Sequence, residues 1–201
     1  YPKEIEYHCK NIFTSLNISN LNCQKIPEVA TELIINSLIW GESKAFFSAQ
    51  KTSRGVSISI CDSGKGFFNT ITRKYQDPEF QFKFKPIDDI ESLLMGCLTN
   101  KFNDAEYGLA DLIDQVVKLN GTVLMSSNKA EIVWDKELWD VFINSLKSKE
   151  NFTNYDCFTE AIKETKNFTK NKPSSSSQKM TKLPYSLRGA RIVFKIPTTS
   201  K

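Results

Sequence analysis

The sequence predicts an α/β fold in which helices cover a mainly antiparallel sheet. Its 201 residues, 40% of them apolar, are enough to bury one hydrophobic core and to form one domain. Residues 56–61 alternate strictly between apolar and polar, as a half-buried strand does, and a turn near Gly55 joins them to a strand-like stretch at 45–51. The clearest amphipathic helix covers 108–119, where apolar residues recur at i, i+3, i+4, i+7 and i+8.

Three further helices are expected around this hairpin. Two precede it, over 2–16 and over 27–40, and the proline at the start of the second suits a first helical turn. After the hairpin, residues 62–85 carry Gly, Asn and Pro with scattered aromatic residues, which predicts a long loop. The third helix runs from Asp88 to about residue 98, because the Asp88 side chain can cap the first turn while Glu91 reaches back in a capping box.

The C-terminal half is expected to hold three strands and two modest helices. In chain order these are strands at 122–126 and 131–134 around a Ser-Asn-Lys turn, helices at 136–146 and 156–166, and a last strand at 190–196. Between the second helix and the last strand, residues 167–183 are polar and serine-rich. This composition is typical of an irregular linker.

The net charge of +4 is unevenly distributed along the chain. After Glu164 there are nine Lys or Arg residues and no acid, whereas residues 1–164 carry 18 basic and 23 acidic residues. Such a basic segment is typical of a solvated, partly flexible region and less often of a patch for nucleic acid or an acidic partner. The five cysteines form no CxxC pair. The sequence contains no run of about 18 apolar residues, the length that crossing a membrane requires. We therefore expect a cytoplasmic protein without membrane contact.

A helical segment holds the first pair of candidate site residues. In TELIINSLIWGE, residues 31–42, Glu32 and Asn36 lie four residues apart, so both side chains share one face of the helix and can meet one ligand. The solvated edge of an amphipathic helix gives the same pattern. The pair therefore gains meaning only from the segments that follow it.

Two glycine-containing segments hold the other candidates. Asp62 leaves the alternating strand and enters a turn in which Gly64 and Gly66 permit positive φ and a close approach of the backbone. A plain Asp-Ser-Gly turn is the alternative. Gly108 and Leu109 open the strong amphipathic helix, where free N–H groups and the helix dipole favour a phosphate.

Taken in order, these segments resemble the ATP-binding domain of the GHKL superfamily. This superfamily groups gyrase-type topoisomerases, the ninety-kilodalton heat-shock chaperone, histidine kinases and MutL-type mismatch-repair proteins. The segments that carry the resemblance are TELIINSLIWGE, DSGKGF, YGLADLIDQVVKLNGTVLMSS and RGARIVFKIP. The chain looks most similar to stand-alone histidine-kinase-like ATPase domains. The resemblance covers about residues 28–127 and the last ten or so, and it leaves 135–183 as an insertion.

The resemblance implies a two-layer α/β sandwich of the Bergerat type, with a mixed, mainly antiparallel sheet and helices on one face. It also implies ATP and Mg²⁺ as ligands. Glu32 would be the general base, and Asn36 the single protein ligand for Mg²⁺. Asp62 would receive the adenine amino group.

The glycines and the lid also have implied roles. Gly64 and Gly66 would let the backbone approach the base, and the N–H groups near Gly108 and Leu109 would hold phosphate. Residues 67–106 would form the lid over the nucleotide. In RGARIV the usual Gly-Thr of the family is Gly-Ala, which removes a hydroxyl that relatives direct at the adenine site.

Three outputs stay open at this point. The first is an Mg²⁺-dependent ATPase or nucleotide-driven switch. The second is a serine/threonine protein kinase of the anti-sigma-factor type, and the third is a non-catalytic interaction module with a degenerate pocket and a basic C-terminal segment. A protein partner is expected for each, with nucleic acid as the less favoured partner.

Overall fold

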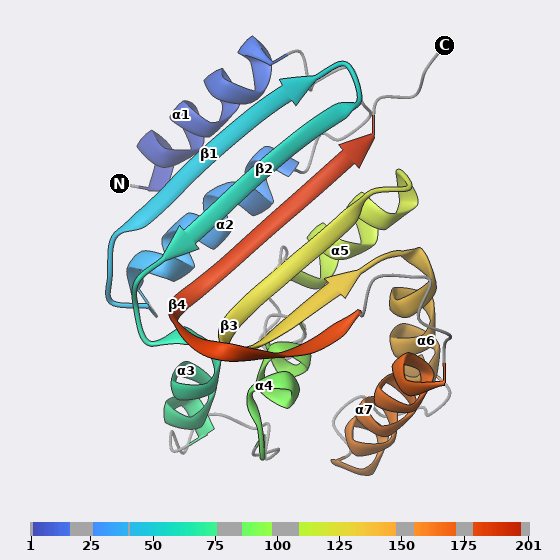
Figure 1. Cartoon of the computed structure of the whole chain (residues 1–201). Coiled ribbons are helices and arrows are strands. Elements are labelled where there is room, and N and C mark those ends of the chain that lie inside the picture. Colours follow the sequence, from blue (N-terminus) through green and yellow to red (C-terminus); the bar gives the residue numbers. More distant parts are fainter. Residues whose placement is uncertain are drawn as a thin grey trace.

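The computed structural model describes residues 2–16, 26–39, 41–75, 86–97, 109–147, 155–171 and 179–197. Within these ranges the chain is an α/β fold with seven helices and one four-stranded sheet in the order β1-β2-β4-β3 (Figure 1). The strands are β1 (Ala45–Thr52), β2 (Gly55–Asp62), β3 (Thr122–Trp134) and β4 (Met180–Pro197). All three pairings are antiparallel, so the expected mixed sheet is wrong for the described chain. The reason is that β4 enters between β2 and β3 and runs opposite to both.

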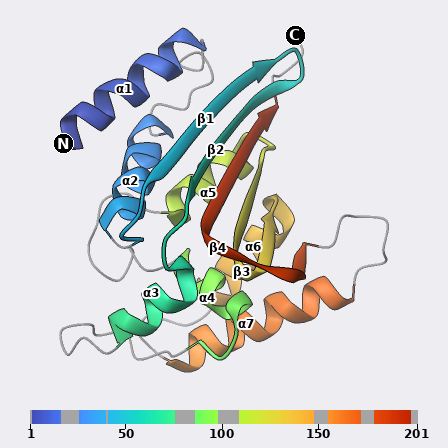
Figure 2. The same ribbon diagram turned by 60° about the vertical axis from the view of Figure 1, so that its left-hand side comes forward.

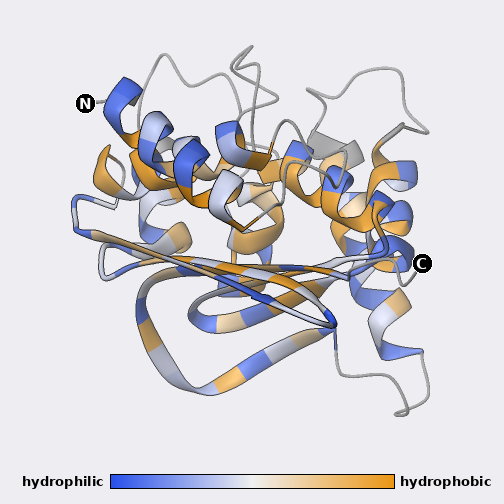
Figure 3. Ribbon diagram, turned by 90° about the horizontal axis from the view of Figure 1, so that it is seen from above, coloured by the Kyte–Doolittle hydropathy of each residue, from blue (hydrophilic) through white to orange (hydrophobic). Residues whose placement is uncertain are grey.

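One face of the sheet is buried and the other carries polar residues. In β2 the alternation places Val56, Ile58 and Ile60 in the core, while Ser57 and Ser59 lie on the other face. The β4 residues opposite the three buried ones are also buried: Ile196, Phe194 and Ile192. Viewed from above, most of the helices lie to one side of the strands (Figure 3).

Two helices cover the centre of the buried face. Helix α2 (Ile26–Ile39) contacts β1 and β2, and α5 (Leu109–Lys118) contacts β3 and β4 and packs beside α2. The predicted amphipathic stripe of α5 is confirmed, because its apolar residues are all buried: Leu109, Ala110, Leu112, Ile113, Val116 and Val117. Helix α1 (Pro2–Ser15) packs on α2 (Figure 2), and the ring of Phe13 lies 6.1 Å from that of Phe47 in β1.

The expected loop at 62–85 is wrong for its first part, because α3 (Gly66–Tyr75) occupies it. Phe67 and Ile71 lie one helical turn apart; Ile71 is buried, and Phe67 packs against the core at Gly96 of α4. Gly and Asn marked the segment as a turn, but the apolar pair one turn apart decides its structure. Residues 76–85 lie outside the described chain.

Helix α4 (Asp89–Gly96) begins at the predicted N-cap, Asp88, and Glu91 reaches back as expected, but to the residue before the cap rather than to Asp88 itself. The Asp88 carboxylate accepts a hydrogen bond of 2.8 Å from the Glu91 N–H, and Glu91 accepts one of 3.0 Å from the Ile87 N–H. These two bonds satisfy N–H groups that have no intrahelical partner. The start of α4 could therefore be predicted from the local sequence.

The expected Ser-Asn-Lys turn is wrong, because these residues lie within one continuous strand, at an irregularity in its pairing with β4. β3 runs through Asn128, which has a φ of 51°, and its register to β4 shifts on both sides of that residue. The Asp89 carboxylate of α4 anchors this part of β3 by accepting hydrogen bonds from Asn128 Nδ2 (3.1 Å) and from the Lys129 N–H (3.3 Å). The turn was predicted because only the last part of β4, at 190–196, was expected to be a strand, and the residues that pair with β3 beyond Asn128 were expected to be a linker.

The expected linker at 167–183 is wrong at both ends. Its first residues continue α7 (Tyr155–Lys170), and its last residues begin β4, where Met180 pairs with Ile132. Two basic residues, one just before the expected linker and one within it, are structural rather than solvated. Lys166 pairs with the nearly buried Glu91 at 2.8 Å, and the buried Lys179 pairs with Asp135 at 2.7 Å. Residues 172–178 lie outside the described chain.

An aromatic cluster attaches α6 (Lys136–Lys147) and α7 to the end of β3. The ring centroids of Trp134 and Trp139 lie 5.3 Å apart, and Phe142 lies 5.3 Å from Trp134 and 6.4 Å from Phe158. All four side chains are buried. In the described ranges, no helix has both the length and the apolarity that crossing a bilayer requires.

We expect Phe142→Ala to lower the free energy of unfolding by about 3–5 kcal/mol, because it removes a buried ring that packs against three others. Urea denaturation measures this. Phe46→Ala is the control, since that ring is 57% exposed and its loss should cost only about 0.5 kcal/mol. Both variants should unfold in one transition, as one domain does; a separate transition for the α6–α7 region would contradict a single cooperative core.

Candidate functional site

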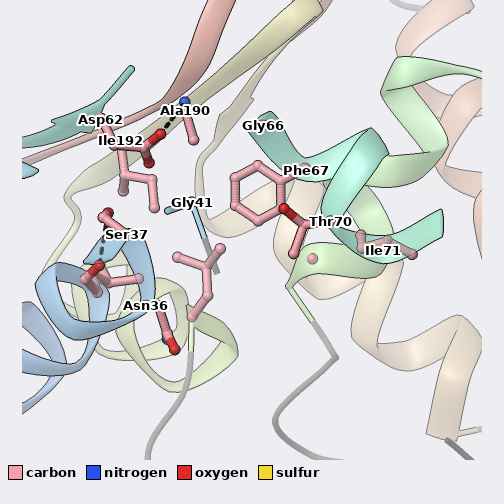
Figure 4. Close-up of a pocket in the computed structure, with 13 residues that line it drawn as sticks. Asn36, Ser37, Gly41, Asp62, Gly66, Phe67, Thr70, Ile71, Ala190 and Ile192 are labelled. Carbon is pink, nitrogen blue, oxygen red and sulfur yellow. Dashed lines mark hydrogen bonds between the residues drawn. The ribbon is translucent and has the colours of Figure 1, made fainter. Parts of the chain in front are cut away.

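A cavity lies between α2, α3, the end of α4, the start of α5, the end of β2 and the middle of β4 (Figure 4). Its volume is about 110 Å³, and part of it is open to solvent. The lining combines apolar side chains with a few polar groups. Its residues are Leu33, Asn36, Ser37, Gly41, Asp62, Gly66, Phe67, Thr70, Ile71, Gly96, Leu109, Ala190 and Ile192.

Four of the predicted site residues line this one cavity: Asn36, Asp62, Gly66 and Leu109. They come from α2, the end of β2, the start of α3 and the start of α5. The structure therefore brings the amide of the second helix and the aspartate after the alternating strand to a common space. Figure 4 shows Asp62 beside Ala190, with Asn36 on a different side of the lining.

The other three predicted residues differ in position. Glu32 is half-buried on α2 next to Leu33, but it is not among the described residues that line the cavity. Gly64 lies against the cavity residue Gly41, whose carbonyl oxygen occupies the place a Cβ at position 64 would need. Gly108 lies outside the described residues. The roles of all seven toward a ligand stay predictions.

The Asp62 carboxylate is held in place through one oxygen. Its Oδ1 accepts hydrogen bonds from the Gly64 N–H at 2.8 Å and from the Ala190 N–H at 3.3 Å. Its Oδ2 has no hydrogen-bond partner within the described chain. A carboxylate fixed through one oxygen can present the other to a ligand that donates a proton, because an ionised carboxyl group only accepts hydrogen bonds.

Two glycines with positive φ allow the chain to fold closely on itself at this end of the sheet. Gly66 has a φ of 72°, and a Cβ there would lie 2.6 Å from Ser127 Oγ. Gly189 has a φ of 84°, and a Cβ there would collide with the Asp62 carbonyl oxygen. These glycines are therefore required by packing, whether or not a ligand is bound.

An exposed ion-pair cluster joins three pieces of chain at the rim. Glu42, which follows α2 and has a φ of 49°, pairs with Lys65 of the glycine turn at 2.7 Å and with Arg73 of α3. Hydrogen bonds from Lys65 and then Arg73 hold the pKa of the Glu42 carboxyl below its usual value. Because all three side chains are solvated, the cluster orients the rim more than it stabilises the fold.

The predicted site missed the wall that α3 supplies. Phe67, Thr70 and Ile71 line the cavity, and their i, i+3, i+4 spacing is the signal that could have identified them. The Phe67 ring fits there because Gly96 has no side chain; a Cβ at that position would collide with the ring. Ser37 was also missed, and its hydroxyl donates a 2.9 Å bond to the Leu33 carbonyl.

The lining of the cavity has an apolar part, which we call the apolar slot, and polar groups of different kinds. Leu33, Phe67 and Ile192 offer apolar surface to a planar ring, Asp62 offers an acceptor, and the start of α5 offers N–H groups without intrahelical partners. This arrangement suits a ligand with an aromatic ring, an amino group and an anionic group. Within the described residues, no cluster of three or more His, Cys, Asp or Glu side chains could hold a metal ion.

Comparisons of the chain with protein-family models, with curated proteins and with solved structures found no match. The candidate site is therefore supported by its geometry and by the chemistry of its residues.

We expect Gly189→Ala to lower the free energy of unfolding by at least about 2 kcal/mol, because it forces a side chain into a left-handed backbone conformation and against the Asp62 carbonyl. Chemical denaturation measures the change. Arg188→Ala is the matched control, because that neighbouring side chain is exposed and should matter little. Equal stability of both variants would contradict the close approach of β4 to Asp62.

Proposed function

We propose that this chain is an ATP-binding module that works with Mg²⁺, built as a two-layer α/β sandwich of the Bergerat type. The observation that carries the proposal is that Asn36 and Asp62 line one cavity together with the start of α5. The placement of α2 and α5 over one sheet face supports the finer fold. We also place the module in the cytoplasm, in keeping with the free thiols of Cys9, Cys61 and Cys97.

The base side of the proposed site consists of Asp62 and the apolar slot. The second carboxylate oxygen of Asp62 would accept a hydrogen bond from the exocyclic amino group of adenine. Phe67 and Ile192 would pack against the faces of the ring. Guanine carries an acceptor where adenine carries its amino group, so a carboxylate at this place disfavours guanine.

The phosphate side consists of Asn36 and the first turn of α5. The first N–H groups of α5 and its dipole favour an anion, and Leu109, its first residue, lines the cavity. The amide oxygen of Asn36 suits Mg²⁺, which usually takes one or two protein ligands and completes its shell with phosphate oxygens and water. Bound there, Mg²⁺ would neutralise charge on the phosphates.

Glu32 is the proposed base for hydrolysis. It lies one helical turn before Asn36, so the two side chains share a face of α2. A carboxylate at this position could take a proton from a water molecule near the terminal phosphate. The same module could instead transfer the phosphoryl group to a partner protein, and the first measurement below does not depend on which of the two occurs.

We expect ATP with Mg²⁺ at a hundred times its Kd to stabilise the protein by about 2.7 kcal/mol, measured by thermal denaturation. Asp62→Asn should remove most of this effect for ATP and should narrow the difference between ATP and GTP, because an amide no longer selects an amino group. Asp140→Asn, which changes an exposed acid on α6, is the control and should behave as the parent chain does. No stabilisation of the parent chain at millimolar ATP would refute the proposed function.

We expect Glu32→Ala to bind Mg²⁺-ATP with unchanged affinity and to release phosphate at least about a hundredfold more slowly, since general-base catalysis is worth roughly 10²–10⁴-fold. Phosphate release under single-turnover conditions measures the rate, and titration calorimetry measures the affinity. Glu28→Ala removes an acid one turn earlier on α2 and serves as the control. Phosphate release by Glu32→Ala at the parent rate would remove Glu32 from this role.

A further inference from the structure

Ser127 holds a buried hydroxyl at the point where β3 and β4 lose their regular register. Its side chain is 1% exposed, and the register shift begins directly after it. The hydroxyl donates a hydrogen bond of 2.8 Å to the Gly189 carbonyl and accepts one of 3.0 Å from the Phe67 N–H. One oxygen thus connects β3 to Gly189 of β4 and to the start of α3.

The peptide unit between Gly189 and Ala190 links this hydroxyl to Asp62. Its carbonyl oxygen accepts the bond from Ser127, and its N–H donates the 3.3 Å bond to Asp62 Oδ1. Because the peptide unit is planar, any rotation that moves its carbonyl also moves its N–H. Gly189 permits such a rotation more readily than any other residue would, since it has no side chain to oppose it.

We infer that Ser127 is a positioning residue that fixes the direction of the Asp62 carboxylate and thereby sets the base selectivity of the cavity. This inference rests on the proposed nucleotide function. With the hydroxyl present, the Gly189–Ala190 peptide is held from its carbonyl side, and Oδ1 of Asp62 receives a donor in a fixed direction. Oδ2 then points where a ligand amino group can meet it.

The same hydroxyl also positions the aromatic wall. The Phe67 N–H lies in the first turn of α3, where a backbone donor has no intrahelical acceptor. By accepting from it, Ser127 fixes the start of the helix whose Phe67 ring lines the cavity. A single group therefore sets the carboxylate and the ring that would recognise the two features of an adenine base.

The neighbouring Ser126 separates this role from that of an ordinary buried hydroxyl. Ser126 is equally buried, at 0% exposure, and donates a 2.9 Å hydrogen bond to Glu131. Its side chain lies on the opposite face of the strand, because successive strand residues alternate. Its removal should therefore cost similar stability without touching the Gly189–Ala190 peptide.

The test compares the ratio of ATP to GTP affinity in Ser127→Ala and Ser126→Ala by titration calorimetry. We expect Ser127→Ala to lower this ratio about tenfold, the effect of one misdirected hydrogen bond, and Ser126→Ala to leave it within about twofold. In an Asp62→Asn background, Ser127→Ala should cause no further change, because the two residues act through one path. An unchanged ratio in Ser127→Ala, or equal effects with and without Asp62, would overturn the inference.

Amide hydrogen exchange provides a readout that needs no nucleotide. We expect the Ala190 amide to exchange at least about tenfold faster in Ser127→Ala than in the parent chain, and not in Ser126→Ala. Absence of ATP binding by the parent chain would refute the proposed function, whereas an unchanged Ala190 amide would refute the positioning role. If Ser127→Ala does not fold, Ser127→Cys keeps the buried volume and replaces the hydroxyl by a weak donor, so it should show the same changes to a smaller degree.

Discussion

The close approach of three chain segments at one end of the sheet is the constraint on which the site depends. The Gly189 backbone lies against the Asp62 carbonyl, and the Gly66 backbone lies against Ser127 Oγ. No room for a side chain remains at either glycine, so α3, β2 and β4 meet through backbone and hydroxyl contacts rather than through apolar packing. Away from this end of the sheet, the apolar side chains of α2 and α5 pack against the strands in one hydrophobic core. This packing holds in place the strands that contribute to the site.

Elements specified by local signals were predicted well. The N-cap at Asp88, the stripe of α5 and the alternation of β2 each depend on residues that lie close together in the sequence, and each is present. Elements specified by distant partners were not. β3 was predicted as two strands, because its pairing with β4, in which Asn128 lies opposite Leu187, about sixty residues later, exists only in the folded chain. The α3 helix was not predicted, because glycine and asparagine near its start are typical of a loop.

The same difference between local and distant signals decides which site residues could be predicted from the sequence. Asn36 and Asp62 stand in short segments whose order along the chain suggested ligand chemistry, and both line the cavity. Ser127 could not be found in this way, because a serine in a strand has no local feature that marks it. Its importance comes from a carbonyl and an N–H that belong to residues far along the chain. Glu32 illustrates the reverse case, since its spacing to Asn36 is right but the cavity lining does not include it.

The polar residues of the site support the proposed function, whereas its glycines do not bear on it. Chain packing alone requires Gly66 and Gly189, so their presence would be the same in a protein that binds nothing. Packing does not require a carboxylate at position 62: one oxygen receives two backbone donors, and an amide oxygen could accept the same bonds. It does not require an amide at position 36 on an apolar helix either. Since neither side chain is needed to fill the core, the proposal of a ligand rests on these two residues and on the cavity that they share.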